Sequence, residues 1–302
     1  MNQSAITAVV RQELRTARRE RLPMILLAVF FVLIAAATFI GWMTHTTVTS
    51  VYNEALREGA TSQPNPFLLV APLDSVKNIV IYISLIGALL AIVMGVQSAL
   101  RDRKAKVLGM VFSRPLHRRA YAAAKLSGIM LWLAVVLAVA ALMTWVSVWI
   151  VHGQPVPLGQ VGQLMLFFFV SWCFLLPFAA IGLWSGMSSR QETTALLLPI
   201  LIWALIMFIV PQLGTAAEPI SFLNPVPAQV ASTGPFFSFN QHFLQPLSYI
   251  DHYKAVSSVV LQYTDASSLA VQLSEAIGLA LATTAAYIFV SPRMIRSGEL
   301  YE

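Results

Sequence analysis

Apolar side chains occur along this chain in six long, nearly uninterrupted runs that are separated by polar and basic stretches. A helix needs about 20 apolar residues to cross the roughly 30 Å hydrocarbon core of a bilayer. The runs are continuous rather than alternating, which favours transmembrane helices over a β-barrel. The pattern predicts an all-α membrane protein with spans at residues 22–43, 76–99, 124–151, 163–186, 195–213 and 269–290.

The composition excludes a water-soluble globule and a disordered chain. Hydrophobic residues make up 58% of the 302 residues and charged residues only 11%, whereas a soluble domain carries about 25% charge. Disordered chains are poor in apolar residues, which is the opposite of what is found here. The lone cysteine, Cys173, also excludes a disulfide framework and a metal site built from several cysteines.

The basic residues predict the orientation of the six spans. Sixteen of the nineteen Lys and Arg residues fall on the side of the membrane that would hold both termini. Cytoplasmic loops carry such an excess of positive charge, so we expect both termini in the cytoplasm. The pI of about 9.7 then follows from topology, and nucleic acid is not an expected partner.

Three segments outside the spans carry further predictions. Residues 4–19 have one apolar and one basic face, which is typical of an amphipathic helix lying in the lipid headgroup layer. The proline-containing segments 44–75 and 214–268 are interpreted as outer loops. Phenylalanines in the second indicate short helices that enter the membrane interface or cap the bundle. We expect residues 1–302 to form a single transmembrane domain.

The connection between the second and third spans is longer and more basic than two helices require. Its first half is expected to continue the second span as a helix with an apolar strip that includes Val107 and Phe112. Ser113-Arg-Pro115 then ends this helix, because the residue before a proline avoids the helical conformation. A second helix leads into the third span. Such a hairpin is suited to press on a cytoplasmic partner, and a solvated basic loop is the simpler alternative.

The residues of this connection resemble the first cytoplasmic loop of type-2 ABC exporter permeases. The resemblance is carried by Arg-Asp-Arg at 101–103, Ser-Arg-Pro-Leu at 113–116, and then Tyr121 and Lys125. It is nearest the branch that contains the permeases of nitrous-oxide-reductase maturation and of gliding motility. The order of an amphipathic amino-terminal helix, six spans and a long outer segment before the last span is also similar.

This resemblance implies the permease subunit of a bacterial ABC exporter in the cytoplasmic (inner) membrane. It implies a homodimer that works with two copies of a separate ATPase subunit, and a substrate path along an interface of the first, second and fifth spans. ATP and Mg²⁺ would belong to the ATPase, because this chain has no Gly-x-x-x-x-Gly-Lys-Ser/Thr loop. We therefore expect no enzyme activity and no catalytic, cofactor or metal site in this chain.

The resemblance also implies a coupling helix within residues 101–118 that rests in a groove of the ATPase. The side chains expected to couple the two subunits are Arg101, Asp102, Arg103, Lys104, Lys106, Val107, Leu108, Val111, Phe112, Ser113, Pro115 and Arg118.

Other functions stay open. An ATP-independent secondary transporter or channel would need ionisable groups near mid-membrane. Glu275 is the one acid well inside a predicted span, and it is a candidate for gating or for an interfacial position near Lys254. An intramembrane enzyme would need a cluster of His, Asp or Glu in the spans, which the sequence does not contain. A membrane scaffold subunit would transmit ATPase work without moving cargo.

Two smaller features predict how the spans pack. The pair Gly182-x-x-x-Gly186 indicates that the fourth span closely approaches another helix. Pro177, Pro199 and Pro211 indicate kinks in the fourth and fifth spans.

Overall fold

The fold is a bundle of long helices, and nearly all of the described chain is helical. A computed structural model of the protein describes residues 3–17, 20–60, 62, 72–104, 117–153, 155–215, 225, 234–243, 248–262 and 269–300. The elements in chain order are α1 (Gln3–Ala17), α2 (Arg21–Arg57), η2 (Pro72–Val76), α3 (Ile79–Tyr82), η3 (Ile83–Gly87), α4 (Ala88–Lys104), α6 (Arg118–His152), α7 (Leu158–Ser188), α8 (Glu192–Ala204), η4 (Leu205–Ile209), α9 (Val210–Thr215), α10 (Pro235–Phe243), α11 (Tyr249–Val260) and α12 (Leu269–Leu300).

Six helical segments of the described chain are long and apolar enough to cross a membrane. The second runs from η2 through α4 and the fifth from α8 into α9, whereas α2, α6, α7 and α12 each provide one of the others. Each segment includes one of the six predicted runs, so the prediction of an all-α membrane protein is confirmed. Their bounds are Arg21–Arg57, Pro72–Lys104, Arg118–Val151, Leu158–Ser188, Glu192–Leu213 and Leu269–Arg296.

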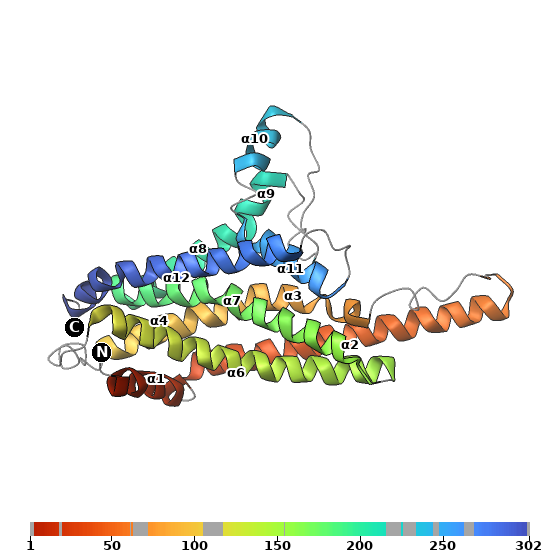
Figure 1. Ribbon diagram of the computed structural model, residues 1–302, viewed down its shortest axis with the longest axis horizontal. Helices are drawn as coiled ribbons and strands as arrows, with labels where there is room; N and C mark the ends of the chain where they lie inside the picture. The colour runs from red at the N-terminus through yellow and green to blue at the C-terminus, as the bar shows by residue number, and fades with distance from the viewer. Residues whose placement is uncertain are drawn as a thin grey trace.

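The first span differs from its prediction, because residues 44–57 continue α2 instead of beginning a loop. No glycine or proline occurs between Gly41 and Gly59 to stop the helix. Gly59, with a φ of 67° in the left-handed region, follows Glu58, which is the C-cap of the helix. The 37 residues of α2 extend about 55 Å. Figure 1 accordingly shows the far part of α2 projecting beyond the bundle.

The centre of the bundle is formed by α4 and α7, and glycines bring these two helices into close contact. A Cβ atom placed on Gly186 would lie 2.6 Å from the Cβ of Ala99, and one placed on Gly182 would overlap the carbonyl oxygen of Ile92. The close approach indicated by Gly182-x-x-x-Gly186 is therefore confirmed. In contrast, α2, α8 and α12 lie at the periphery, with only 17% of the most apolar window of each span buried.

Within the segment interpreted as the second outer loop, α11 packs against α7 and compensates for a proline. Pro177 has no N–H to donate to the carbonyl oxygen of Cys173 four residues earlier. The hydroxyl of Tyr249 lies 3.4 Å from that oxygen and supplies a donor. One turn further, the hydroxyls of Tyr253 and Ser171 lie 2.8 Å apart. α11 thus packs on the bundle, whereas Phe236, Phe239 and Phe243 of α10 are exposed, so the predicted role of the phenylalanines stays a prediction.

The fifth span is interrupted twice. Pro199 leaves the carbonyl oxygen of Ala195 without its helical donor, and the hydroxyl of Ser185 on α7 donates to this oxygen at 2.8 Å. The following turn, η4, is a π-helix, as is η3 in the second span. The indole N–H of Trp203 donates to the carbonyl oxygen of Ser84 in η3 at 3.5 Å. The last turn of α8, just before η4, is therefore in contact with η3.

The glycine contact between α4 and α7 generates a stability prediction. Gly182→Ala should lower the free energy of unfolding by about 1–3 kcal/mol, because the new methyl group forces a tightly packed interface apart. Gly278→Ala is the matched control, since Gly278 lies in α12 with nothing within 4 Å of an added Cβ. That change should be neutral or stabilising, because alanine is the better helix former. Unfolding in detergent micelles, followed by circular dichroism, measures both, and equal effects would contradict the assigned contact.

Candidate functional site

Five ionisable side chains from three helices and from the residue before α2 meet at one end of the bundle. Figure 1 shows that this end of the bundle also holds both termini. We refer to the five side chains as the ion-pair cluster: Glu13 of α1, Glu20 before α2, Arg101 and Asp102 of α4, and Lys125 of α6. Lys125 is only 1% exposed, and Glu13 and Asp102 are 4% exposed. Buried charges are stable only when they are paired and hydrogen-bonded. The cluster therefore requires its helices to stay together.

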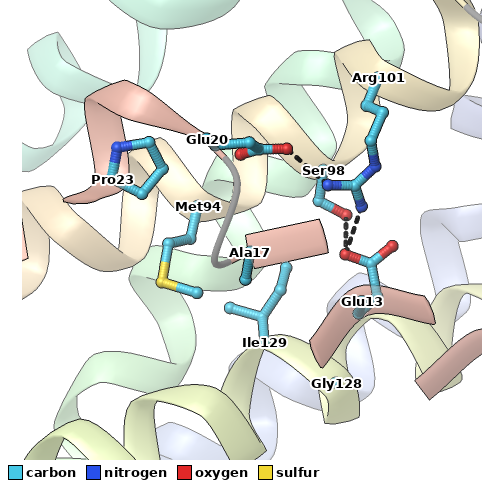
Figure 2. Close-up of a pocket in the computed structure, with 9 residues that line it drawn as sticks. All are labelled: Glu13, Ala17, Glu20, Pro23, Met94, Ser98, Arg101, Gly128 and Ile129. Carbon is cyan, nitrogen blue, oxygen red and sulfur yellow. Dashed lines mark hydrogen bonds and ion pairs between the residues drawn. The ribbon is translucent and has the colours of Figure 1, made fainter. Parts of the chain in front are cut away.

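The carboxylate of Glu13 accepts bonds from both α4 and α6. Its Oε2 atom lies 2.6 Å from Nη2 of Arg101 and accepts a bond of 2.9 Å from the hydroxyl of Ser98, as Figure 2 shows. Its Oε1 atom lies 2.9 Å from Nζ of Lys125. Close contact is possible because a Cβ on Gly128 of α6 would lie only 2.7 Å from the Cβ of Glu13. One side chain thus attaches α1 to two spans.

Lys125 is the cation at the centre of the cluster. Its Nζ atom lies 2.6 Å from Oδ2 of Asp102, in addition to its contact with Glu13. It also donates to the carbonyl oxygen and the hydroxyl of Ser98 at 2.8 Å. The hydroxyl of Tyr121, one turn earlier on α6, donates to Asp102. All the hydrogen-bonding capacity of the ammonium group is directed at α1 and α4.

Arg101 extends the cluster to the start of the first span. Its Nη1 atom lies 2.5 Å from Oε1 of Glu20 (Figure 2). The cavity between Glu13, Glu20, Ser98 and Arg101 has a volume of about 10 Å³, which is close to the space of a single water molecule. It has no room for a cofactor or a transported molecule. Within the described residues, no group of three His, Cys, Asp or Glu side chains is placed to hold a metal ion.

The two glutamates differ in their electrostatic surroundings. Burial raises the pKa of Glu13, but Lys125 and Arg101 more than offset burial, so this pKa lies below its ordinary value. Burial also raises the pKa of Glu20, and Arg101 offsets this only in part, so the pKa of Glu20 lies above its ordinary value. The structure therefore favours the charged form of Glu13 and disfavours the charged form of Glu20.

The residues that follow on α4 connect it to the fourth and fifth spans. Nη1 of Arg103 donates to the carbonyl oxygens of Gly186 and Ser189 at 2.8 and 2.7 Å. A cation at this position stabilises the negative end of the α7 dipole. Lys104 lies 2.9 Å from Glu192 at the start of α8, and both side chains are 60% exposed. Consecutive residues of α4 thus reach α1, α6, α7 and α8.

The predicted coupling residues have different structural positions. Asp102 and Arg103 are buried, and Arg101 is half-buried, so these three bind helices of the same chain rather than present a free surface. Lys104 is exposed, and Arg118 is half-buried at the start of α6. The remaining predicted residues lie outside the described part of the chain: Lys106, Val107, Leu108, Val111, Phe112, Ser113 and Pro115. The ATPase contact stays a prediction.

The sequence reasoning did not find the partners of the cluster on α1 and before α2. Tyr121 and Lys125 were part of the family resemblance, but their contacts with Asp102 and Glu13 were not foreseen. One signal was available, because Glu13 lies four residues after Val9 and four before Ala17 in the apolar stripe of α1. An acid in such a stripe indicates a buried cationic partner.

Glu275, the candidate for gating, lies near the other end of α12. Its side chain is 47% exposed, and Oε2 lies 3.0 Å from Nδ1 of His252 on α11. The structure thus pairs Glu275 with His252 rather than with Lys254, the neighbour considered from the sequence. This exposure does not place an isolated acid in the interior of the bundle, and the gating role stays a prediction.

The fold and this cluster define a multi-pass helical membrane protein whose second and third spans are locked to its amino-terminal helix. The sequence matches the family described as ABC-2 family transporter protein over residues 7–293. Because the match covers nearly the whole chain, the protein belongs to this family. It is a membrane permease component of an ABC transporter, not an enzyme by itself. No curated protein matches the chain.

The cluster predicts a large difference between its two glutamates. Glu13→Gln should lower the free energy of unfolding by about 3–5 kcal/mol, because it leaves Lys125 and Arg101 partly uncompensated in a buried site. Glu20→Gln should change it by less than about 1 kcal/mol, since Glu20 is less buried and the structure already disfavours its charged form, so that its ion pair with Arg101 contributes little. Unfolding of both variants in detergent micelles, followed by tryptophan fluorescence, measures the difference.

The pH dependence provides a second readout of the same cluster. The pKa of Glu13 is lower in the folded protein than its ordinary value of 4.5. The ionised carboxylate therefore stabilises the fold above pH 4.5, and this stabilisation is lost as the pH falls through the pKa of the folded state. Glu13→Gln should therefore lose stability less steeply than the wild type below about pH 4.5. If the free energy of unfolding falls equally steeply with pH for the two proteins, the charge of Glu13 does not hold the ion-pair cluster together.

Proposed function

We propose that this protein is the membrane subunit of an ATP-driven exporter in the bacterial inner membrane, with energy supplied by a separate ATPase subunit. The observation that carries the proposal is the family match together with the ion pair between Asp102 and Lys125, which joins α4 to α6. We refer to these two helices and their connection as the hairpin. Both helices of the hairpin enter the bundle at the ion-pair cluster. A hairpin fixed in this way can transmit displacement of its tip to several spans.

The proposed transmission starts at the short segment between α4 and α6, residues 105–116. When an ATPase subunit moves this segment, α4 and α6 move with it because Asp102 and Lys125 join them. Glu13 carries the motion to α1. Arg103 and Lys104 carry it to the end of α7 and the start of α8. These contacts support a coupling role even though Asp102 and Arg103 are too buried to touch the ATPase.

The proposed substrate path lies between two copies of the chain, along α2, the second span and α8. Support comes from a stripe of exposed apolar side chains at every fourth position of the fifth span: Leu197, Leu201, Leu205, Ile209 and Leu213. The π turns η3 and η4 lie in the second and fifth spans, and such turns are frequent at functional sites. Two copies of the chain with two ATPase subunits complete the proposed assembly.

The proposed orientation places both termini and the ion-pair cluster in the cytoplasm. Support comes from basic residues at the end of the bundle that holds the termini, such as Arg119 at the start of α6, Arg190 after α7 and Arg293 in the last third of α12. Within the family, we further propose the branch of nitrous-oxide-reductase maturation and gliding-motility permeases, because the motifs at 101–103 and 113–116 are most similar to it.

The coupling proposal predicts the effect of reversing exposed charges on the hairpin. Lys104→Glu with Lys106→Glu should weaken binding of the ATPase subunit about tenfold or more, because like charges at an interface repel. The folded bundle should remain intact, since the Lys104–Glu192 pair is exposed and contributes little. The measurement is ATPase activity and subunit binding of the complex purified from its own bacterium.

Lys77→Glu is the control, because Lys77 also forms an ion pair near the end of a helix, with the half-buried Asp74, but lies at the start of the second span. This control should bind and stimulate the ATPase like the wild type. An unchanged complex with the Lys104 and Lys106 variant would exclude this hairpin as the docking point. A wild-type chain that associates with no ATPase would contradict the proposed exporter as a whole.

A further inference from the structure

The helices α7 and α12 pack side by side (Figure 1). An open groove of about 260 Å³ lies on the surface between them. Its lining includes Pro177, Ala180 and Trp184 of α7 and Thr283, Ala286 and Val290 of α12. Both helices are membrane spans. The groove therefore opens toward lipid rather than toward water along this part of the helices.

The size and lining of the groove suit one flexible hydrocarbon chain. None of the residues that line it carries a charge. Its volume is slightly below the roughly 300 Å³ at which pockets for compact, drug-sized ligands begin. Its Thr283 hydroxyl donates to the carbonyl oxygens of Leu279 and Ala280 in the same helix, so it is already satisfied. An acyl chain fills such a groove without leaving a polar group unpaired.

Basic side chains lie just beyond one end of the groove. Arg293 follows Val290 by three residues and lies on the same face of α12, and Arg190 follows the end of α7 beyond Trp184. Both arginines are exposed. Both helix ends belong to the end of the bundle that holds the termini, since Arg103 binds Ser189 after α7 and the C-terminus follows α12. Trp184 near this mouth is typical of a membrane interface.

From this arrangement we propose that the groove is a binding site for an anionic phospholipid. One acyl chain lies between α7 and α12, and the phosphate accepts hydrogen bonds from Arg190 and Arg293 at the mouth. Guanidinium groups bind phosphate oxygens in this way. Each basic residue near the membrane surface also attracts lipids of net negative charge. The site is separate from the proposed dimer interface, and it needs no ATPase.

Trp184 makes the groove observable by fluorescence. The full chain is reconstituted in phosphatidylcholine vesicles that contain increasing fractions of phosphatidylglycerol with brominated acyl chains, which quench tryptophan. The signal of Trp184 is the difference between the wild type and Trp184→Phe. Because both leaflets carry the same lipid, the result does not depend on the orientation of the protein. We expect saturable quenching at low fractions of brominated phosphatidylglycerol, and much weaker quenching by brominated phosphatidylcholine at the same fractions.

Arg293→Gln should lower the preference for phosphatidylglycerol over phosphatidylcholine about fivefold, and Arg190→Gln should have a similar effect. The matched control is Arg11→Gln, which removes an exposed arginine from α1 at the same end of the bundle. It should leave the preference unchanged. Circular dichroism of each variant reports whether the fold is intact, so that lost binding is not confused with unfolding.

Filling the groove tests the site of the acyl chain. Ala286→Leu places a larger side chain in the groove from an exposed position, whereas Ala285→Leu adds the same volume at an exposed neighbour outside it. Only the first should reduce quenching of Trp184. Equal quenching by both lipids, unaffected by the arginine variants, would overturn the proposal in favour of nonselective contact with acyl chains. No quenching by either lipid would overturn it in favour of a groove covered by protein.

Discussion

The position of the amino-terminal helix depends on a buried carboxylate, that of Glu13, among Lys125, Arg101 and Ser98. Removing charges from water costs several kcal/mol per ion, and this is offset only while the partners remain in place. Separation of α1 from α4 or α6 would leave at least one charge uncompensated. The cluster therefore acts as a joint that is rigid when complete and strongly destabilised when one of its buried members, Glu13, Asp102 or Lys125, is lost.

The joint explains why residues that resemble a coupling motif are found inside the protein. Arg101 and Asp102 bind α1 and α6, and Arg103 binds the carbonyl groups at the end of α7. Further along, α4 packs on α7 through Gly182 and Gly186. Under the proposed coupling mechanism, a movement of α4 would therefore be shared by the central helices. The peripheral fifth span, with Pro199 and a π turn, is the more deformable element.

The six spans could be predicted from the sequence because membrane insertion depends on the length of each apolar run, which is a local property. The close contact of Gly182 and Gly186 with another helix could also be predicted, because the spacing of two glycines is a local property of the sequence. The ion-pair cluster could not, because it joins residues more than 80 positions apart, such as Glu13 and Ser98. The hydroxyl of Ser185 that replaces the donor missing at Pro199 is likewise a consequence of tertiary packing. The continuation of α2 to Arg57 was missed although no residue stops it.

The most direct test of the joint is a distance measurement between α1 and α6 during the ATPase cycle. Arg11 and Leu142 are each replaced by a spin-labelled residue in a Cys173→Ala background. Leu142 is exposed on α6, about 21 Å along the helix from Gly128. Double electron–electron resonance should give one narrow distance that is unchanged between nucleotide-free and ATP-bound complexes, and a broad distribution after Glu13→Gln. A wild-type distance that changes with nucleotide, or that is already broad, would contradict the rigid joint.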